Sequence, residues 1–277
     1  MKARISEAVI LMAGCGSRLR QGYGGQAQLR GADETFLKPL VPLLGRPLVS
    51  YTLESLAKAG IGKITGVIGF EAHRLSDALR KLVPAGAELR LIENPEWEKQ
   101  NGISVLAAQG RVKAPFLLTM SDHVFDRTII DLLIERADTS VLNLAVDSKV
   151  NSLFDLDDAM KVQTRGDRVV EIGKNLSNYN AIDTGLFVCP EEIFDQLERA
   201  KKNGDCSLAD GVRLMAAEGK VRAIDIDEKW WQDVDTPEML KRAEDLLRAR
   251  SAGRLTAGAI APHGDNRKRQ SDRGHQK

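Results

Sequence analysis

An apolar run that opens into a glycine-containing turn constrains this chain more than any other feature. The run AVILMA begins at Ala8 and leads directly into Gly14, Gly16, Ser17 and Arg18. A short apolar run followed by such a turn predicts a buried strand of a parallel sheet. Glycine has no Cβ, so the backbone at Gly14 and Gly16 can take φ > 0 and present its N–H groups to an anion. With the forked donors of Arg18 beside it, the turn is predicted to bind phosphate.

A second cation is predicted near this turn by the segment FLKPL. Its Lys38 precedes Pro39, and proline restricts the backbone of the residue before it. Two cations beside a glycine turn suit a triphosphate. The turn lacks the third glycine of the dinucleotide motif and the lysine ending of the nucleoside-triphosphatase loop. Glu71, near the end of the second predicted strand, leaves a dinucleotide-dependent oxidoreductase as an alternative, which the missing glycine disfavours.

Composition and charge narrow the class of protein. The chain has 277 residues, and 43% of them are hydrophobic, which is enough for a core. Its net charge of +1 argues against a general nucleic-acid binder. Cys15, Cys189 and Cys206 form no C-x-x-C pair, which fits a reducing cytoplasm. The run at Ala8 is too short for a signal peptide, and no segment reaches the roughly 20 apolar residues of a spanning helix. We therefore expect a soluble, cytoplasmic protein with no membrane span.

Strand and helix patterns alternate along the first half of the chain. Helices are predicted over 47–59, 72–82 and 128–136, and strands over 63–69, 88–92 and 116–120. Such alternation predicts a parallel sheet with helical crossovers. The predicted fold class is α/β: a single Rossmann-like domain over 1–250, with a mostly parallel central sheet flanked by helices. Residues 251–277 lose periodicity and are predicted to be a disordered tail or a linker.

A polar segment over 93–104 follows the third predicted strand. Loops at the carboxyl ends of parallel strands line the ligand crevice of such sheets. Asn101 and Ser104 carry groups that can contact a pyrimidine edge or a ribose, and Gly102 permits close approach. Helix capping by Asn101 or Ser104, ahead of a short helix predicted over 105–109, is an equal alternative.

The buried strand over 116–120 delivers Asp122 and His123 to the same edge of the sheet as the glycine turn. Mg²⁺ prefers hard oxygen ligands, typically one or two carboxylates together with substrate phosphates. Asp122 is therefore predicted to be a metal ligand. The alternative, that it caps the next helix, is weaker because Asp126 is the better cap. Imidazole suits magnesium poorly, so His123 is expected to be a neighbour and not a ligand.

A small β-rich insertion is predicted to cover the acceptor side of the site. Its strands are expected over 141–146, 160–164, 169–172 and 181–188, the middle two forming a hairpin. Lys174, Thr184 and Gly185 are candidates to hold the phosphate and hydroxyl groups of an acceptor. The glycine breaks its strand where something approaches closely. For Lys174, a solvated turn lysine is the alternative.

The C-terminal part is predicted to form helices over 191–202 and 207–218, the second opened by a capping box of Ser207 and Asp210. A strand is predicted over 220–227, and the chain then reaches WWQDVDTPE. Thr236 is the natural N-cap of a last helix, with Pro237 in its first turn. Asp233 and Asp235 precede this cap, on one side of an extended segment. Because Thr236 already caps the helix, Asp235 is free for another role.

Two features are left with two interpretations each. Trp230 and Trp231 fit core packing, and an aromatic cage for a quaternary ammonium is the alternative. The glycine-rich residues 22–35, which include Arg30, fit either a mobile flap beside the phosphates or a surface insertion without a role.

The segments MAGCGSRL, FLKP, VPLLGRPLVSYTLESL, LLTMSD and WWQDVDTPE together resemble the nucleotidyltransferases that activate phosphorylated sugars and alcohols. The resemblance implies that Asp122 and Asp235 hold Mg²⁺ and that Arg18 and Lys38 contact the pyrophosphate as catalytic residues. It implies nucleotide contacts at Ala13, Gly14, Gly16, Ser17, Asn101, Gly102 and Ser104, and acceptor contacts at Lys174, Thr184 and Gly185. The long insertion before Lys38 departs from the family pattern.

Within that family, NGISV, EIGKNL and AIDTGLF look most like the cytidylyltransferases that join CTP to inositol 1-phosphate. This likeness implies CDP-inositol and pyrophosphate as products, and phospholipid biosynthesis as the setting. Phosphocholine or a sugar 1-phosphate is the alternative acceptor, and a non-catalytic nucleotide-binding regulatory subunit is the alternative class. The family is often fused to a membrane CDP-alcohol phosphotransferase, so we expect a functional link to such an enzyme.

Overall fold

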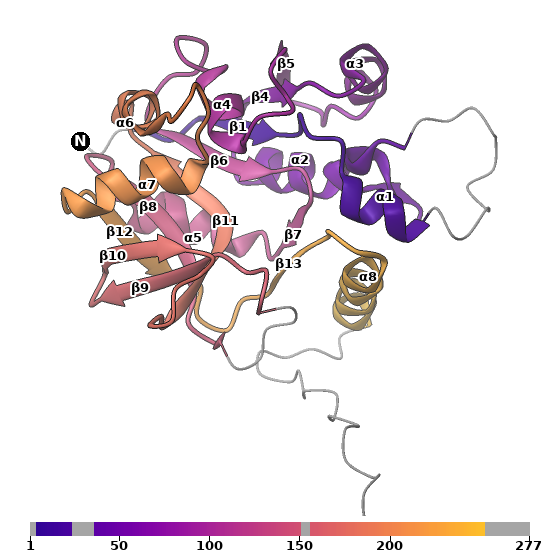
Figure 1. Cartoon of the computed structure of the whole chain (residues 1–277). Helices are drawn as coiled ribbons and strands as arrows, with labels where there is room; N and C mark the ends of the chain where they lie inside the picture. The colour runs from indigo at the N-terminus through magenta and orange to yellow at the C-terminus, as the bar shows by residue number, and fades with distance from the viewer. Residues whose placement is uncertain (1–3, 24–35, 151–155, 253–277) are drawn as a thin grey trace, which may run out of the picture.

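The structure, a computed structural model, describes residues 4–23, 36–150 and 156–252, which are built around one large sheet (Figure 1). This sheet has nine strands in the order β5-β4-β1-β6-β11-β8-β12-β10-β9. They span Glu88–Glu93 (β5), Lys63–Ile68 (β4), Glu7–Leu11 (β1), Phe116–Met120 (β6), Ala181–Cys189 (β11), Leu142–Asp147 (β8), Val221–Asp225 (β12), Arg168–Gly173 (β10) and Lys161–Arg165 (β9). Two small sheets pair β2 (Pro42–Leu43) with β3 (Arg46–Pro47), and β7 (His123–Phe125) with β13 (Trp231–Asp233).

The sheet is parallel on one side and mixed on the other. Strands β5, β4, β1 and β6 are parallel neighbours, and so are β8 and β12. Strand β11 runs antiparallel to both β6 and β8. The predicted hairpin is present as β9 and β10, and it extends the edge of the central sheet. The predicted α/β class, with a central sheet flanked by helices, is confirmed.

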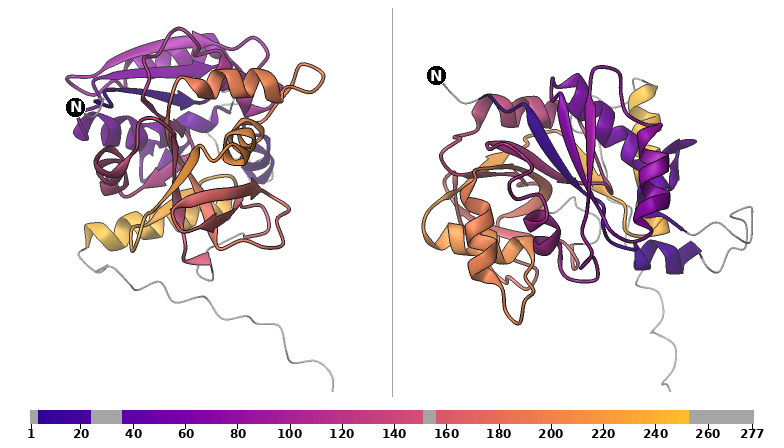
Figure 2. Two further views of the ribbon diagram at one scale, coloured as in Figure 1. Left: turned by 90° about the vertical axis from the view of Figure 1, so that its left-hand side faces the viewer. Right: turned by 90° about the horizontal axis from the view of Figure 1, so that it is seen from above.

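Helices cover both faces of the sheet (Figures 1 and 2). They span Ser17–Tyr23 (α1), Leu48–Lys58 (α2), Ala72–Arg80 (α3), Asn101–Leu106 (α4), Thr128–Arg136 (α5), Glu192–Ala200 (α6), Leu208–Ala217 (α7) and Pro237–Ser251 (α8), with a 3-10 turn η1 at Lys38–Leu40. Successive strand side chains point to opposite faces. Val9 and Leu11 pack with α4, α6 and α7, whereas Ala8 and Ile10 pack with α2, α3 and α5. The apolar run is thus buried on both sides, as in other parallel sheets.

Local sequence signals set several helix ends. Thr236 caps α8 by accepting from the backbone N–H of Met239, and Pro237 is its first residue. Ser207 and Asp210 form a reciprocal capping box at α7. Both caps are as predicted, because a cap depends on residues at most three positions apart.

The topology brings distant segments to one edge of the sheet. Strands β1 and β6 are parallel, with Leu11 opposite Met120, so the glycine turn and Asp122 follow neighbouring strands. Strand β13 pairs with β7, which places Asp233 opposite His123. Among the described residues, no helix is long and apolar enough to cross a membrane. Residues 24–35 of the glycine-rich segment, which include Arg30, lie outside the described residues. The predicted tail also lies outside them from residue 253 onward; its first residue, Ser251, is the last residue of α8.

Candidate active site

The centre of the candidate site is the ammonium group of Lys38. Its Nζ donates to Oδ2 of Asp122 at 2.6 Å and also to Oδ1 of Asp235. Lys38 begins η1, Asp122 follows β6, and Asp235 directly precedes the cap of α8. The side chain of Lys38 is only 9% exposed, and the two carboxylates offset the cost of burying its charge. One predicted cation and both predicted metal ligands therefore meet at one point.

Arg18 extends this arrangement toward the hairpin. One guanidinium nitrogen donates to Oδ2 of Asp235 at 2.6 Å, and the other donates to Asp158. Lys174 in turn donates to Oδ1 of Asp158 at 2.5 Å. A continuous charge cluster results, formed by Lys174, Asp158, Arg18, Asp235, Lys38 and Asp122. The long insertion between Arg18 and Lys38 does not separate them, because both contact Asp235.

Asp158 is a member of this cluster that no sequence motif marks. It lies 140 positions from Arg18 along the chain, at the end of a polar segment that the sequence shows only as a loop. Two adjacent carboxylates, Asp157 and Asp158, were the only signal, and nothing local distinguishes them. In the structure Asp157 is exposed, whereas Asp158 contacts two cations.

The electrostatics of the cluster favour its charged forms. Burial opposes ionisation of Asp122, but the Lys38 ammonium and the His123 ring lower the pKa of Asp122 well below its usual range. Burial also opposes the charged form of Lys38, and Asp122 and Asp235 outweigh it, so the pKa of Lys38 is raised. The pKa of Asp158 is likewise lowered, because its partial burial is outweighed by Lys174 and Arg18. The charged forms of Asp122, Lys38 and Asp158 are therefore favoured near neutral pH.

The two glycines of the turn serve different purposes. Gly16 has φ +63°, and a Cβ there would lie 2.7 Å from Cβ of Lys38. Its missing side chain thus makes room for the stem of Lys38. A Cβ on Gly14 would meet no atom within 4 Å, and Gly14 lines an open pocket. Gly14 is therefore the glycine whose missing side chain leaves space for a ligand.

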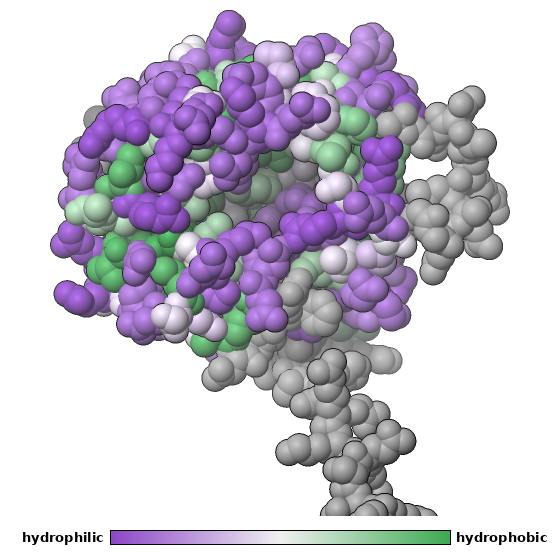
Figure 3. Space-filling view, viewed as in Figure 1, coloured by the Kyte–Doolittle hydropathy of each residue, from purple (hydrophilic) through white to green (hydrophobic). Residues whose placement is uncertain are grey.

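A pocket beside the charge cluster collects most of the predicted nucleotide-binding residues. It is lined by Leu11, Met12, Ala13, Gly14, Gly16, Lys38, Pro39, Trp97, Lys99, Asn101, Ser104, Met120, Ser121 and Asp122. The face shown in Figure 3 is predominantly hydrophilic and is hollowed near its centre. Trp97 and Lys99 belong to this pocket but were not singled out in the sequence. Ser17 and Gly102 are not among its lining residues; Ser17 begins α1.

The segment NGIS is helical, whereas its sequence pattern predicts a loop. Helix α4 begins at Asn101 and not at residue 105. The Oδ1 of Asn101 accepts from the backbone N–H of Leu208, the first residue of α7, so Asn101 helps to cap a different helix. Ser104 is buried and accepts from Asn94. Gly102 packs against the backbone of Cys206, at the point where a Cβ would lie 2.6 Å from its carbonyl oxygen. Tertiary contacts between α4 and α7 explain the difference.

The three predicted acceptor residues lie in different surroundings. Lys174 is half-exposed and joins the charge cluster through Asp158. Thr184 is fully buried, and its hydroxyl donates to the carbonyl oxygen of Ala145 at 2.9 Å, so it does not face an open site. Gly185 has φ +73°, and the group that approaches it closely is the ring of His123. Of the three, only Lys174 belongs to the charge cluster.

The remaining singled-out aromatic and acidic residues have partners within the protein. Trp231 donates to Asp147 at 3.0 Å, and Trp230 lies against the guanidinium group of Arg250 at 5.6 Å. These contacts fit the packing interpretation. Burial raises the pKa of Asp233, whose Oδ1 accepts from Gln232. Unlike Asp235, Asp233 forms no contact with a cation among the described residues.

Comparison with known proteins identifies the family. A family model described as MobA-like NTP transferase domain matches residues 8–209. The chain belongs to this family. A relative from Thermococcus kodakarensis, named bifunctional IPC transferase and DIPP synthase, is 35% identical over 243 residues, which are 87% of this chain and 50% of the relative. The relative of the same name from Aquifex aeolicus is 30% identical over 244 residues, 88% of this chain and 52% of the relative. The chain thus spans about half the length of these curated relatives.

Solved structures of NTP transferases share the fold. The inositol-1-phosphate CTP transferase from T. maritima superposes with a TM-score of 0.77 at 24% identity, over 92% of this chain and 100% of that one. A UDP-glucose pyrophosphorylase complexed with UDP-glucose gives a TM-score of 0.69 at 14% identity, over 89% of this chain and 99% of that one. At such identities the likeness establishes the fold alone. The nucleotidyltransferase family and the fold predicted from the sequence are confirmed.

The carboxylates of this NTP transferase suit a hard cation. Within the described part of the chain, no three His, Cys, Asp or Glu side chains are grouped so as to hold a metal ion. Asp122 and Asp235 form a pair, and Mg²⁺ typically takes one or two carboxylates and completes its shell with water and substrate phosphates. Each carboxylate has about four lone-pair sites, so contacts to Lys38, Arg18 and His123 leave capacity for a further ligand. The donor set therefore fits magnesium.

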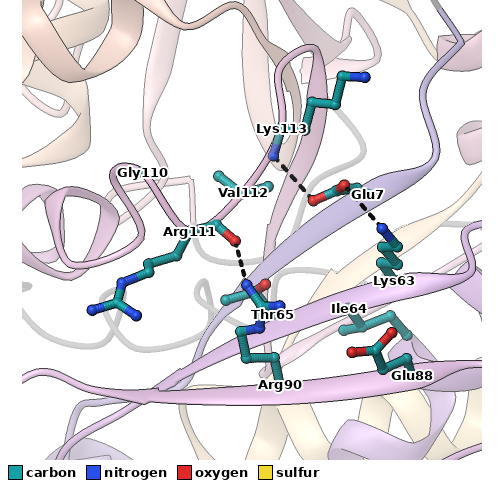
Figure 4. A pocket seen from close by; sticks show the side chains of 10 residues that line it. All are labelled: Glu7, Lys63, Ile64, Thr65, Glu88, Arg90, Gly110, Arg111, Val112 and Lys113. Carbon is teal, nitrogen blue, oxygen red and sulfur yellow. Dashed lines mark hydrogen bonds and ion pairs between the residues drawn. The ribbon is translucent and has the colours of Figure 1, made fainter.

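A second hollow lies at the opposite ends of the strands, between the start of β1 and β4 and the segment before β6 (Figure 4). Three of its charged side chains have partners within the protein: Lys63 lies 3.8 Å from Glu7, the backbone N–H of Lys113 donates to Glu7, and Arg90 donates to the backbone carbonyl of Arg111. Parallel sheets bind ligands at the carboxyl ends of their strands. The pocket beside the charge cluster is therefore the better candidate.

Proposed function

We propose that this NTP transferase is a magnesium-dependent cytidylyltransferase that joins CTP to inositol 1-phosphate, giving CDP-inositol and pyrophosphate. The observation that carries the proposal is the meeting of Arg18, Lys38, Asp122 and Asp235 beside the glycine-turn pocket. The relatives named IPC transferase support the choice of substrates.

The reaction requires alignment more than chemical activation. An oxygen of the acceptor phosphate attacks the α-phosphorus of the nucleotide, and the bond from that phosphorus to the oxygen bridging to the β-phosphorus breaks. The acceptor phosphate is already nucleophilic at neutral pH, so no covalent enzyme intermediate is needed. The protein must hold two mutually repelling anions in line and offset the charge that develops. Lys38 and Arg18 would offset charge on the α-phosphate and pyrophosphate, and Lys174 would hold the acceptor phosphate.

Asp122 and Asp235 would hold the Mg²⁺, and the metal would add positive charge beside the phosphates. The pocket residues Ala13, Gly14 and Gly16 would contact the triphosphate. Asn101, with an exposed amide, and Trp97 and Lys99 would contact the nucleoside. Ser17, Gly102, Thr184 and Gly185, which do not line the pocket, would instead keep the site in its folded shape.

The wider setting is also a proposal. We infer one catalytic domain over residues 1–250, acting in the cytoplasm, with the tail outside it. The curated relatives are about twice as long as the matched region and are named bifunctional. This supports a functional link with an enzyme that consumes the nucleotide-activated product, such as a membrane CDP-alcohol phosphotransferase.

The proposal is tested by pyrophosphate release. Each of the four nucleoside triphosphates is combined with inositol 1-phosphate, phosphocholine and glucose 1-phosphate, with Mg²⁺ present or chelated. We expect release with CTP and inositol 1-phosphate, and its loss on chelation and in Asp122→Asn. Release with another pair would keep the mechanism and replace the substrates. Nucleotide binding without release from any pair would favour a regulatory subunit.

A further inference from the structure

The ring of His123 forms a hydrogen bond and a ring stack in addition to ordinary packing contacts. His123 begins β7, directly after Asp122. Its Nδ1 lies 2.7 Å from Oδ1 of Asp122, on the side of the carboxylate that Lys38 does not occupy. An ionised carboxylate only accepts hydrogen bonds, so Nδ1 carries the hydrogen and donates. The Asp122 carboxylate is therefore bound at both oxygens.

Strand β11 makes room for this ring. The register between β11 and β8 shifts between Asp183 and Phe187, which marks a bulge at Gly185. A Cβ on Gly185 would lie 2.5 Å from Nε2 of His123, and its φ of +73° disfavours any other residue. The glycine at this position of the strand is thus explained by the imidazole that packs on it.

The ring of His123 is also held by Trp231. The two rings are stacked, with centroids 6.0 Å apart and planes inclined by 9°. Trp231 is itself fixed, because its Nε1 donates to Oδ2 of the buried Asp147 at 3.0 Å. The backbone carbonyl of His123 accepts from the hydroxyl of Thr52 at 3.1 Å. Helix α2 and strands β11 and β13 therefore all hold His123 in one orientation.

We propose that His123 is a positioning residue, which fixes the rotation of the Asp122 carboxylate so that its other oxygen faces Lys38 and the metal. This role rests on the proposed function of Asp122 as a metal ligand. A free aspartate side chain rotates about its χ angles, and a fixed donor at one oxygen prevents this. Partners that orient a metal ligand typically contribute about 10- to 100-fold in metal affinity or activity.

Two substitutions separate this role from simple space filling. His123→Asn keeps an N–H donor near the position of Nδ1, whereas His123→Leu fills space without a donor. In Gly185→Ala the added Cβ collides with the ring and displaces it, while the imidazole itself is retained. The matched control is His73→Asn, because the side chain of His73 is 92% exposed and lies outside the site.

The readouts are Mn²⁺ binding to the CTP-bound protein, followed by electron paramagnetic resonance, and the Mg²⁺ concentration for half-maximal pyrophosphate release. We expect His123→Leu and Gly185→Ala to weaken Mn²⁺ binding about 10-fold or more, and His123→Asn to stay within about 3-fold of the wild type. Gly185→Ala added to His123→Leu should have little further effect, because both break the same contact. Thermal unfolding checks that each variant is folded.

Equal Mn²⁺ affinities in His123→Asn and His123→Leu, whether both weak or both unchanged, would overturn the positioning role. A wild-type protein that binds no Mn²⁺ with CTP would overturn it as well. If the expected order of Mn²⁺ affinities appears but no pyrophosphate is released from CTP and inositol 1-phosphate, the inference stands and the proposed reaction fails.

Discussion

The Nζ atom of Lys38 lies 2.6 Å from Oδ2 of Asp122, although 84 positions separate the two residues in sequence. This pair, with Asp235 on the same ammonium, joins the segment after the glycine turn to the end of β6 and the start of α8. A buried cation is tolerated only where opposite charges surround it. The same requirement gives the site a cation that can offset phosphate charge and carboxylates that can hold a metal.

Replacing Lys38 by Met should damage both catalysis and stability. The loss of a cation that offsets transition-state charge is expected to lower kcat about 100-fold or more. The unfolding free energy should fall by about 3 kcal/mol, because two carboxylates lose a partly buried partner. Single-turnover pyrophosphate release and urea unfolding measure the two effects. Lys58→Met, at a side chain that is 66% exposed, is the control. An unchanged kcat in a folded Lys38→Met variant would exclude the assigned role.

Features that depend on neighbouring residues were predictable from the sequence. The strand β6, the helix α5 and the caps at Ser207 and Thr236 lie where the local patterns placed them. Hydrophobic periodicity and capping act over a few residues, so tertiary context rarely overrides them when they agree.

Features that depend on distant contacts were not predictable in the same way. Asp158 meets Arg18 only through the folded topology, and no local pattern marks it. Asn101 begins a helix because α4 packs against the start of α7, whereas its local sequence suits a loop equally well. Thr184 alternates inward in a strand that is buried on both faces, so its hydroxyl bonds the sheet and not a ligand.

Replacing Asp158 should impair the reaction with the acceptor more than it lowers the stability of the protein. Asp158→Asn removes the charge that joins Arg18 to Lys174 and should lower kcat/KM for the acceptor about 10-fold, since small misplacements of reacting groups are costly. The unfolding free energy should change by less than about 1 kcal/mol, because these ion pairs are exposed. Steady-state kinetics at saturating CTP measure the first effect. The neighbouring Asp157→Asn is the control, and an equal loss there would contradict a specific role.

The two turn glycines should respond differently to substitution. Gly14→Ala adds a methyl group that meets no atom within 4 Å, so the fold should tolerate it while the pocket narrows. We expect a KM for CTP raised about 10-fold, with an unchanged melting temperature. Gly16→Ala collides with Lys38 at a positive φ and should lower both the melting temperature and kcat. Calorimetry and kinetics on the pair check this, and the reverse pattern would place the ligand at Gly16.

Asp183 should make stability depend on pH in a defined direction. Burial raises the pKa of Asp183 from 3.8 to about 6, and the opposing bond from the Gly185 N–H and the nearby His123 do not cancel it. Between these values the native state holds a proton that the unfolded state has lost, so stability falls as pH rises from about 4 to about 6. The stabilisation that the proton on Asp183 contributes is fully present below about pH 4. A shift of this size corresponds to about 2 to 3 kcal/mol.

Asp183→Asn should remove this dependence. The amide has no proton to lose, and its oxygen still accepts from the Gly185 N–H, a bond that is 2.7 Å long in the structure. The variant should therefore equal the wild type near pH 4 and exceed it in unfolding free energy above pH 6. Urea unfolding from pH 4 to 8 measures the difference, with Asp157→Asn as an exposed control. A difference between variant and wild type that stays constant with pH would show that burial does not raise the pKa of Asp183.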